Sequence, residues 1–140
     1  MKKILHAFDV DVPREKVFAA LTTQPGLSGW WTTEVSLEKG EVTRIRFHFA
    51  DDFNPCMEVI QLEPNQIVKW KCIEGHANWL ANIFSFTLKE SGAQTRVVFT
   101  QDYARELSDD DYGSYNFNWG YYLESLRVYC ETGEGKPFRP

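Results

Sequence analysis

The chain has 140 residues, a length typical of one domain, and it is long enough to bury a core without disulfides or metal ions. Its composition is 43% hydrophobic and 25% charged, which excludes the disordered and fibrous classes. The net charge is −5 and no run of Lys and Arg is present. Because binding to a phosphate backbone requires a basic face, we expect no nucleic-acid partner.

The first residues are not expected to form a signal peptide. Asp9 and Asp11 interrupt any apolar segment that could follow Lys2 and Lys3. No stretch of the sequence approaches the length of a transmembrane helix. We therefore expect a cytoplasmic protein that does not insert into membranes.

The three cysteines are expected to be free thiols. Cys56, Cys72 and Cys130 are an odd number and lack the spacing of metal ligands. A hairpin turn at Pro64-Asn65 sets residue 57 opposite Cys72, so Cys56 points to the other face of the sheet. A disulfide between Cys56 and Cys72 would therefore require a bulge.

The N-terminal part of the chain predicts one strand followed by two short helices. Residues 4–10 alternate between apolar and polar side chains, as a half-buried strand does, and the strand stops at Pro13. Residues 13–21 form a helix with the proline in its first turn, and Val17, Phe18 and Leu21 make its apolar stripe. Residues 24–29 form a second, broken helical turn.

The middle of the chain predicts a meander of three hairpins. Their strands are residues 34–37 and 42–49, 57–62 and 67–72, and 83–89 and 95–100. In residues 42–49, Phe47 shares one face with residues 45 and 49, while His48 shares the other with two arginines. A turn at Ser91-Gly92 in the third hairpin sets Phe84 opposite Phe99. Every hairpin thus has one apolar and one polar face, which is typical of an antiparallel sheet wetted on one side.

The C-terminal part predicts a long helix over residues 115–132, after an acidic turn at residues 109–111. Its apolar side chains recur with helical spacing, and Gly133 stands where a glycine commonly ends a helix. The sheet needs a cover for its apolar face, and this helix is the large apolar element that remains. The sequence therefore predicts a single α+β domain over residues 1–140, with a helix-grip fold. A curved antiparallel sheet of about seven strands holds the C-terminal helix on its concave face, and two short helices follow the first strand.

Three segments carry a resemblance to a known family. They are residues 10–22 (VDVPREKVFAALT), residues 29–32 (GWWT) and residues 118–126 (NWGYYLESL). The chain resembles the START-like (SRPBCC, Bet v 1-like) superfamily. Within it, the chain most resembles the family named after the C-terminal domain of the activator of the 90-kDa heat-shock protein ATPase. The resemblance covers essentially the whole chain, and it implies a hydrophobic ligand held between sheet and helix.

The sequence departs from the family pattern at two places. Gly40-Glu41 stands where relatives often have two glycines before a strand. Thr100-Gln101-Asp102-Tyr103 stands where relatives often have a His-Glu-Gly-type segment. Roles attached to those positions are therefore not carried over to this chain.

Large aromatic side chains on the two facing surfaces predict an apolar cavity with a few hydroxyl and indole donors, the usual composition of a small-molecule site. The alternative is a filled aromatic core without a cavity. The loop between the second and third hairpins, which carries His76 and Trp79, is expected to lie at the mouth of this cavity. The residues expected to bind the ligand are Trp31, Phe47, Trp70, Phe84, Phe86, Phe99, Tyr115, Trp119 and Tyr122.

The leading functional hypothesis is a protein that binds an apolar or aromatic small molecule. No catalytic motif is present, and the three histidines lack metal-ligand spacing, so we expect no cofactor and no metal. An enzyme of the cyclase, lyase or hydrolase type is the alternative, and it requires a titratable group inside the cavity. A chaperone-interaction module is the second alternative, and it requires an exposed apolar patch. The sequence does not decide whether the protein forms a homodimer.

Overall fold

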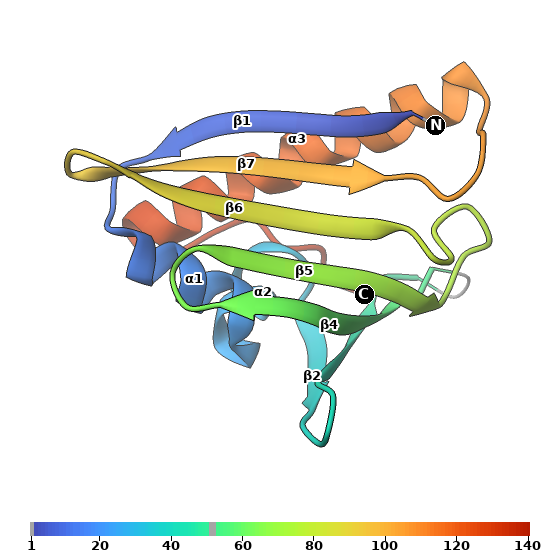
Figure 1. The fold of residues 1–140 in the computed structure, drawn as a ribbon, viewed down its shortest axis with the longest axis horizontal. Helices are drawn as coiled ribbons and strands as arrows, with labels where there is room; N and C mark the ends of the chain where they lie inside the picture. The colour runs from blue at the N-terminus through green and yellow to red at the C-terminus, as the bar shows by residue number, and fades with distance from the viewer. Residues whose placement is uncertain (1, 51–52) are drawn as a thin grey trace.

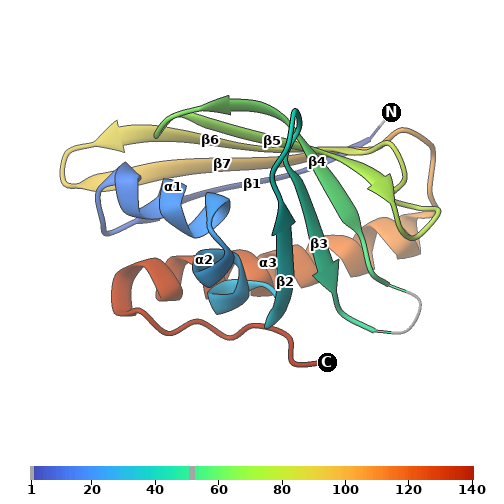
Figure 2. The ribbon, with the colours of Figure 1, turned by 90° about the horizontal axis from the view of Figure 1, so that it is seen from below.

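In the computed structural model, which describes residues 2–50 and 53–140, seven strands form one antiparallel sheet in the order β1-β7-β6-β5-β4-β3-β2. The strands are β1 (Lys3–Val10), β2 (Glu34–Glu38), β3 (Arg44–His48), β4 (Cys56–Glu63), β5 (Ile67–Glu74), β6 (Ile83–Ser91) and β7 (Gln94–Asp102). The helices are α1 (Arg14–Thr22), α2 (Gln24–Trp30) and α3 (Asp109–Thr132). In Figure 1 the sheet lies in front of α3, and Figure 2 shows it curving over α3, with α1 and α2 beneath one end. The predicted α+β helix-grip fold is confirmed.

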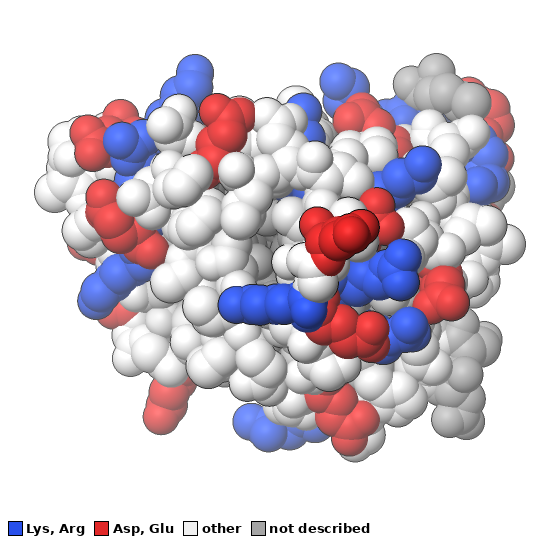
Figure 3. Space-filling model, turned by 60° about the horizontal axis from the view of Figure 1, so that its bottom comes forward, with Lys and Arg blue, Asp and Glu red and all other residues white. Residues whose placement is uncertain are grey.

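The two faces of the sheet differ in polarity as the sequence predicts. On β3, Ile45 and Phe47 are buried while Arg44, Arg46 and His48 are exposed. On the outer face the guanidinium of Arg46 donates to carboxylates on β2 and β5, at 2.9 and 3.0 Å. Figure 3 shows a surface on which acidic and basic side chains are interspersed. The apolar face is therefore the one that receives the helices.

The pairing of β6 with β7 differs from the predicted register by two residues. Phe86, not Phe84, lies opposite Phe99, and Phe84 lies opposite Gln101. The turn is one residue further along the chain than predicted, because Gly92 adopts a left-handed φ of 65° just after the closing pair of the hairpin. An even shift leaves every side chain on its predicted face. Gln101, two residues after Phe99, lies on the same inner face and is fully buried in the apolar layer.

Helix α3 begins at Asp109, six residues before the predicted start at residue 115. The residues predicted as an acidic turn are its first turn, in which Ser108 Oγ accepts a hydrogen bond from the Asp111 amide at 3.1 Å. Aspartates there also interact favourably with the helix dipole. The predicted end is confirmed, since Gly133 caps the helix with a φ of 87°. In the part of the chain that the structure describes, no helix is long and apolar enough to cross a membrane.

The three cysteines are free and buried, which confirms the prediction. Met57 lies opposite Cys72 as expected, and a register shift between Cys56 and Met57 sets Cys56 opposite Glu74. Burial raises the pKa of Cys72 to about 11 and that of Cys130 to about 12. These thiols are therefore protonated at neutral pH and unreactive.

The C-terminal tail returns along α2 and reaches the start of β2. The Phe138 amide donates to the Trp31 carbonyl at 2.8 Å, and the Thr33 amide donates to the Phe138 carbonyl at 2.9 Å. Upstream, the buried hydroxyl of Ser125 donates to a carbonyl of α2 at 2.8 Å and accepts from the Lys136 amide at 2.6 Å. These bonds fix the ring of Phe138, whose centroid lies 5.8 Å from that of Phe49.

Candidate ligand-binding cleft

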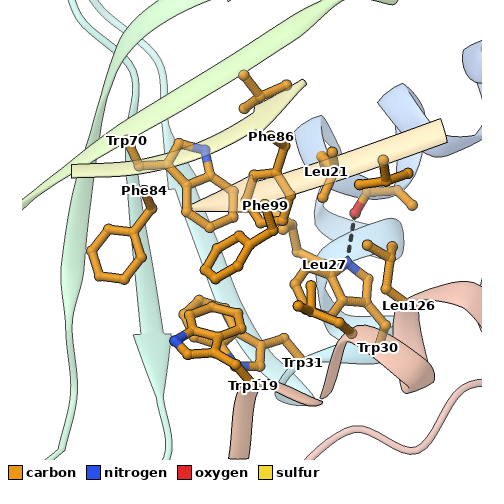
Figure 4. Packing of buried hydrophobic residues seen from close by; sticks show 14 of the residues in the cluster. Leu21, Leu27, Trp30, Trp31, Trp70, Phe84, Phe86, Phe99, Trp119 and Leu126 are labelled. Atoms are coloured by element: carbon orange, nitrogen blue, oxygen red, sulfur yellow. Dashed lines mark hydrogen bonds between the residues drawn. The ribbon is translucent and has the colours of Figure 1, made fainter. Parts of the chain in front are cut away.

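The five ligand-binding residues predicted on the strands form a closed aromatic core. They are 0–1% exposed and pack ring against ring: Phe47, Trp70, Phe84, Phe86 and Phe99. Ring centroids are 5.1 Å apart for Trp70 and Phe86, and 5.0 Å apart for Phe86 and Phe99. Figure 4 shows four of these rings, Trp70, Phe84, Phe86 and Phe99, on the sheet side of Trp31 and Trp119. For these five residues, the alternative of a filled aromatic core without a cavity is therefore the one that the structure shows.

Trp31 joins this core to α3. Its ring centroid lies 4.5 Å from that of Phe47, 5.1 Å from that of Trp119 and 6.1 Å from that of Trp70. Trp119 in turn lies 4.3 Å from Phe99, and its Nε1 donates to Gln101 Oε1 at 2.8 Å. The indoles of Trp31 and Trp119 thus cap the core on the side that faces α3.

A cleft of about 380 Å³ lies above these two indoles. It is bounded by α3, by the segments that precede β4 and β6, and by the C-terminal tail. Its lining residues are Trp31, Phe49, Ala50, Phe53, Trp79, Tyr115, Asn118, Trp119, Tyr122 and Phe138. Four of the predicted ligand-binding residues are among them, namely Trp31, Tyr115, Trp119 and Tyr122. The structure thus divides the predicted set between a core and a cleft.

The other aromatic walls of the cleft come from loops and from the tail. Trp79 lies 4.9 Å from Phe53 and 5.7 Å from Tyr115 between ring centroids. The loop that carries Trp79 was expected to lie at the mouth of the cavity, and Trp79 does line the cleft. His76 does not line it, and its Nδ1 accepts from the Asn78 amide at 3.1 Å. Neither Phe53 nor Phe138 was predicted, because both lie outside any periodic segment and reach the cleft through backbone pairing.

The described lining residues offer aromatic surface and few titratable groups. The ionisable side chains among them are the phenols of Tyr115 and Tyr122, and burial raises the pKa of Tyr122. A phenol is neutral at physiological pH, so these side chains provide hydrogen bonds and not charge. No cluster of His, Cys, Asp or Glu within the described residues is arranged to hold a metal ion. The arrangement is suited to binding an uncharged, apolar molecule.

A curved antiparallel sheet that grips a C-terminal helix defines the START-like class of helix-grip proteins. A family model described as Activator of Hsp90 ATPase homolog 1-like protein matches residues 11–131. The chain therefore belongs to this family. A comparison of the sequence with curated proteins finds no match.

Solved structures similar to this chain share its whole fold. The solution structure of the Aha1 dimer from Colwellia psychrerythraea is 34% identical, with a TM-score of 0.85 over 96% of this chain and 100% of that chain. Protein SSP2350 from Staphylococcus saprophyticus is 26% identical, with a TM-score of 0.72 over 96% of each chain. Protein MLL2253 from Mesorhizobium loti is 20% identical, with a TM-score of 0.75 over 93% of this chain and 97% of that chain. This last likeness concerns the fold alone.

Proposed function

We propose that the protein binds a flat, apolar small molecule in the cleft above Trp31 and Trp119. The observation that carries this proposal is a partly open space of about 380 Å³ walled almost entirely by aromatic rings. Ligand pockets commonly measure about 300–1,000 Å³ and are lined by hydrophobic and aromatic side chains. Burying apolar ligand area there stabilises the complex by about 25 cal/mol per Å². The fold supports the proposal, since it commonly serves as a ligand-binding domain.

The test uses fluorene as a probe and two alanine variants on the same helix. Tyr122 lines the cleft, whereas Phe117 is 77% exposed and does not line it. Fluorene should quench the tryptophan fluorescence and raise the melting temperature of the wild type. Tyr122→Ala should weaken this binding about threefold to tenfold, because an aromatic contact is worth about 0.5–1.5 kcal/mol. Phe117→Ala should change it by less than about twofold. No response of the wild type to fluorene at saturation would contradict the proposal.

We further propose the cytoplasm as the location of the protein. Its three buried cysteines are unpaired, which fits a compartment that keeps thiols reduced.

We also propose self-association, which is supported by the similar protein from Colwellia psychrerythraea, described as a dimer. Phe117 and Tyr121 are 77% and 51% exposed and stand one turn apart on α3. Neither lines the cleft. Sedimentation velocity of the wild type should therefore show a dimer, and Phe117→Asp should shift it to a monomer. A wild type that stays monomeric at about 100 μM, a concentration that populates even a micromolar complex, would contradict the proposal.

A further inference from the structure

Three buried hydrogen-bond donors lie behind the cleft without a partner among the described residues. They are Trp79 Nε1, Gln101 Nε2 and the hydroxyl of Tyr103. The three side chains are 4%, 0% and 3% exposed. Buried donors are almost always paired, and an unpaired one is unfavourable. Three together therefore indicate a missing acceptor.

The three donors are neighbours. Gln101 and Tyr103 are two residues apart and both are buried, so they project from the same face at the end of β7. The Oε1 of Gln101 is engaged by Trp119, which leaves its Nε2 free. The ring of Trp79 is parallel to that of Trp119 within 9°, with centroids 6.0 Å apart. Because Trp79 and Trp119 both line the cleft, the donors lie directly behind its wall.

The donors do not satisfy one another. Burial raises the pKa of Tyr103, and the nearby indole of Trp79 acts in the opposite direction to a smaller extent. The Trp79 indole N–H thus interacts with the Tyr103 oxygen, but in a geometry too poor to pair it fully, and the hydroxyl proton of Tyr103 has no acceptor among the described residues. An acceptor from outside the chain is needed to pair them.

Tyr115 lines the cleft and packs against two of the three donor residues. Its ring lies 6.3 Å from that of Tyr103 and 5.7 Å from that of Trp79. The side chain is half-buried, and its hydroxyl accepts a hydrogen bond from Asn78 Nδ2 at 3.2 Å. A partly exposed ring held at its tip can change rotamer on a fast timescale. Rotation of this ring is the movement that would bring a ligand group in the cleft to the donors.

We propose that the ligand carries a neutral hydrogen-bond acceptor at its inner end, such as a ketone or amide carbonyl. This inference rests on the proposed function. Gln101 Nε2 and the Tyr103 hydroxyl donate to this oxygen, and Trp79 Nε1 completes the site. An anionic acceptor does not fit, because burial already disfavours negative charge at Tyr103, and the carboxylate of Asp111 adds to this effect. The three donor side chains carry no positive charge, and a buried anion that is not paired with a cation is strongly unfavourable. The cleft thus selects a flat aromatic carbonyl compound over the plain hydrocarbon.

The experiment compares fluorene with 9-fluorenone, which has the same tricyclic frame plus one carbonyl. The wild type should bind fluorenone about tenfold more tightly, since a neutral hydrogen bond contributes at that level. Tyr103→Phe should reduce this preference at least about threefold and leave the affinity for fluorene unchanged. The matched control is Tyr121→Phe, which removes an exposed hydroxyl outside the cleft and should keep the preference. Tyr103→Phe should also melt no lower than the wild type without ligand, because it removes an unpaired buried hydroxyl.

The outcomes separate the two proposals. If neither compound binds, the proposed function fails and this inference fails with it. If both bind the wild type equally, or if Tyr103→Phe keeps the full preference, the acceptor site is overturned while the apolar cleft stands. Binding of fluorene-9-carboxylate as tight as that of fluorenone would overturn the requirement for a neutral acceptor.

Discussion

Replacing Leu126 with alanine is expected to lower the free energy of unfolding by about 2–5 kcal/mol. Leu126 is fully buried near the middle of the apolar stripe of α3. The substitution removes apolar surface from the core and leaves a cavity that a stiff helix on a stiff sheet cannot close. Urea denaturation followed by circular dichroism measures the effect as a lower midpoint with an unchanged slope.

Arg96→Ala is the control for this prediction. Arg96 lies on the outer face of β7, where its guanidinium is 3.4 Å from the carboxylate of Asp9. Both side chains are about half exposed, and an ion pair of this kind contributes little in water. The expected change is no more than about 0.5 kcal/mol. Equal losses for Leu126→Ala and Arg96→Ala would mean that the inner and outer faces have been assigned wrongly.

The faces of the sheet were predictable because alternation along a strand reports directly on burial. The apolar residues of β3 and the buried Phe84, Phe86 and Phe99 were all placed on the inner face, and the structure agrees. The register of β6 with β7 was not predictable from alternation, since a shift of two residues leaves the pattern unchanged. Only the backbone conformation of Gly92 decides which pairs face each other.

The cleft was predictable only in part, because burial and cavity lining are different properties. A run of inward aromatic residues, such as Phe84 and Phe86, predicts a core, and ring packing then determines whether space remains. That space lies where the regular elements end, so its further walls are Phe53, Trp79 and Phe138. Their positions depend on loop and tail pairing between segments far apart in sequence.

Gln101 illustrates a second limit. A glutamine near the end of a strand gives no signal for an inner position, since its side chain is usually solvated. It is buried here because Trp119, on the helix that follows β7 in the sequence, supplies a donor for its Oε1. The partner is a tertiary feature, and the same contact makes Gln101 part of the donor group behind the cleft.

Trp119→Ala is expected to lower the free energy of unfolding by about 3–5 kcal/mol, as for other large aromatic residues in cores. Trp119 is 2% exposed and lies between Phe99 and Trp31. The substitution removes these ring contacts and also leaves the buried Oε1 of Gln101 without a donor. A loss of ligand binding in this variant would therefore not identify Trp119 as a binding residue, and thermal or urea unfolding is the appropriate measurement.

The hydrogen bond can be separated from the packing by a double-mutant cycle. Trp119→Phe keeps an aromatic ring but removes the indole donor, and Gln101→Met removes the acceptor with little change of volume. Because an orphaned buried acceptor is more costly than a missing pair, Trp119→Phe should destabilise the Gln101→Met background less than the wild type. The expected coupling is about 1–2 kcal/mol. Strictly additive losses would show that the bond between Trp119 Nε1 and Gln101 Oε1 contributes nothing beyond packing. The polar layer behind the cleft would then have no energetic role in holding α3 to the sheet.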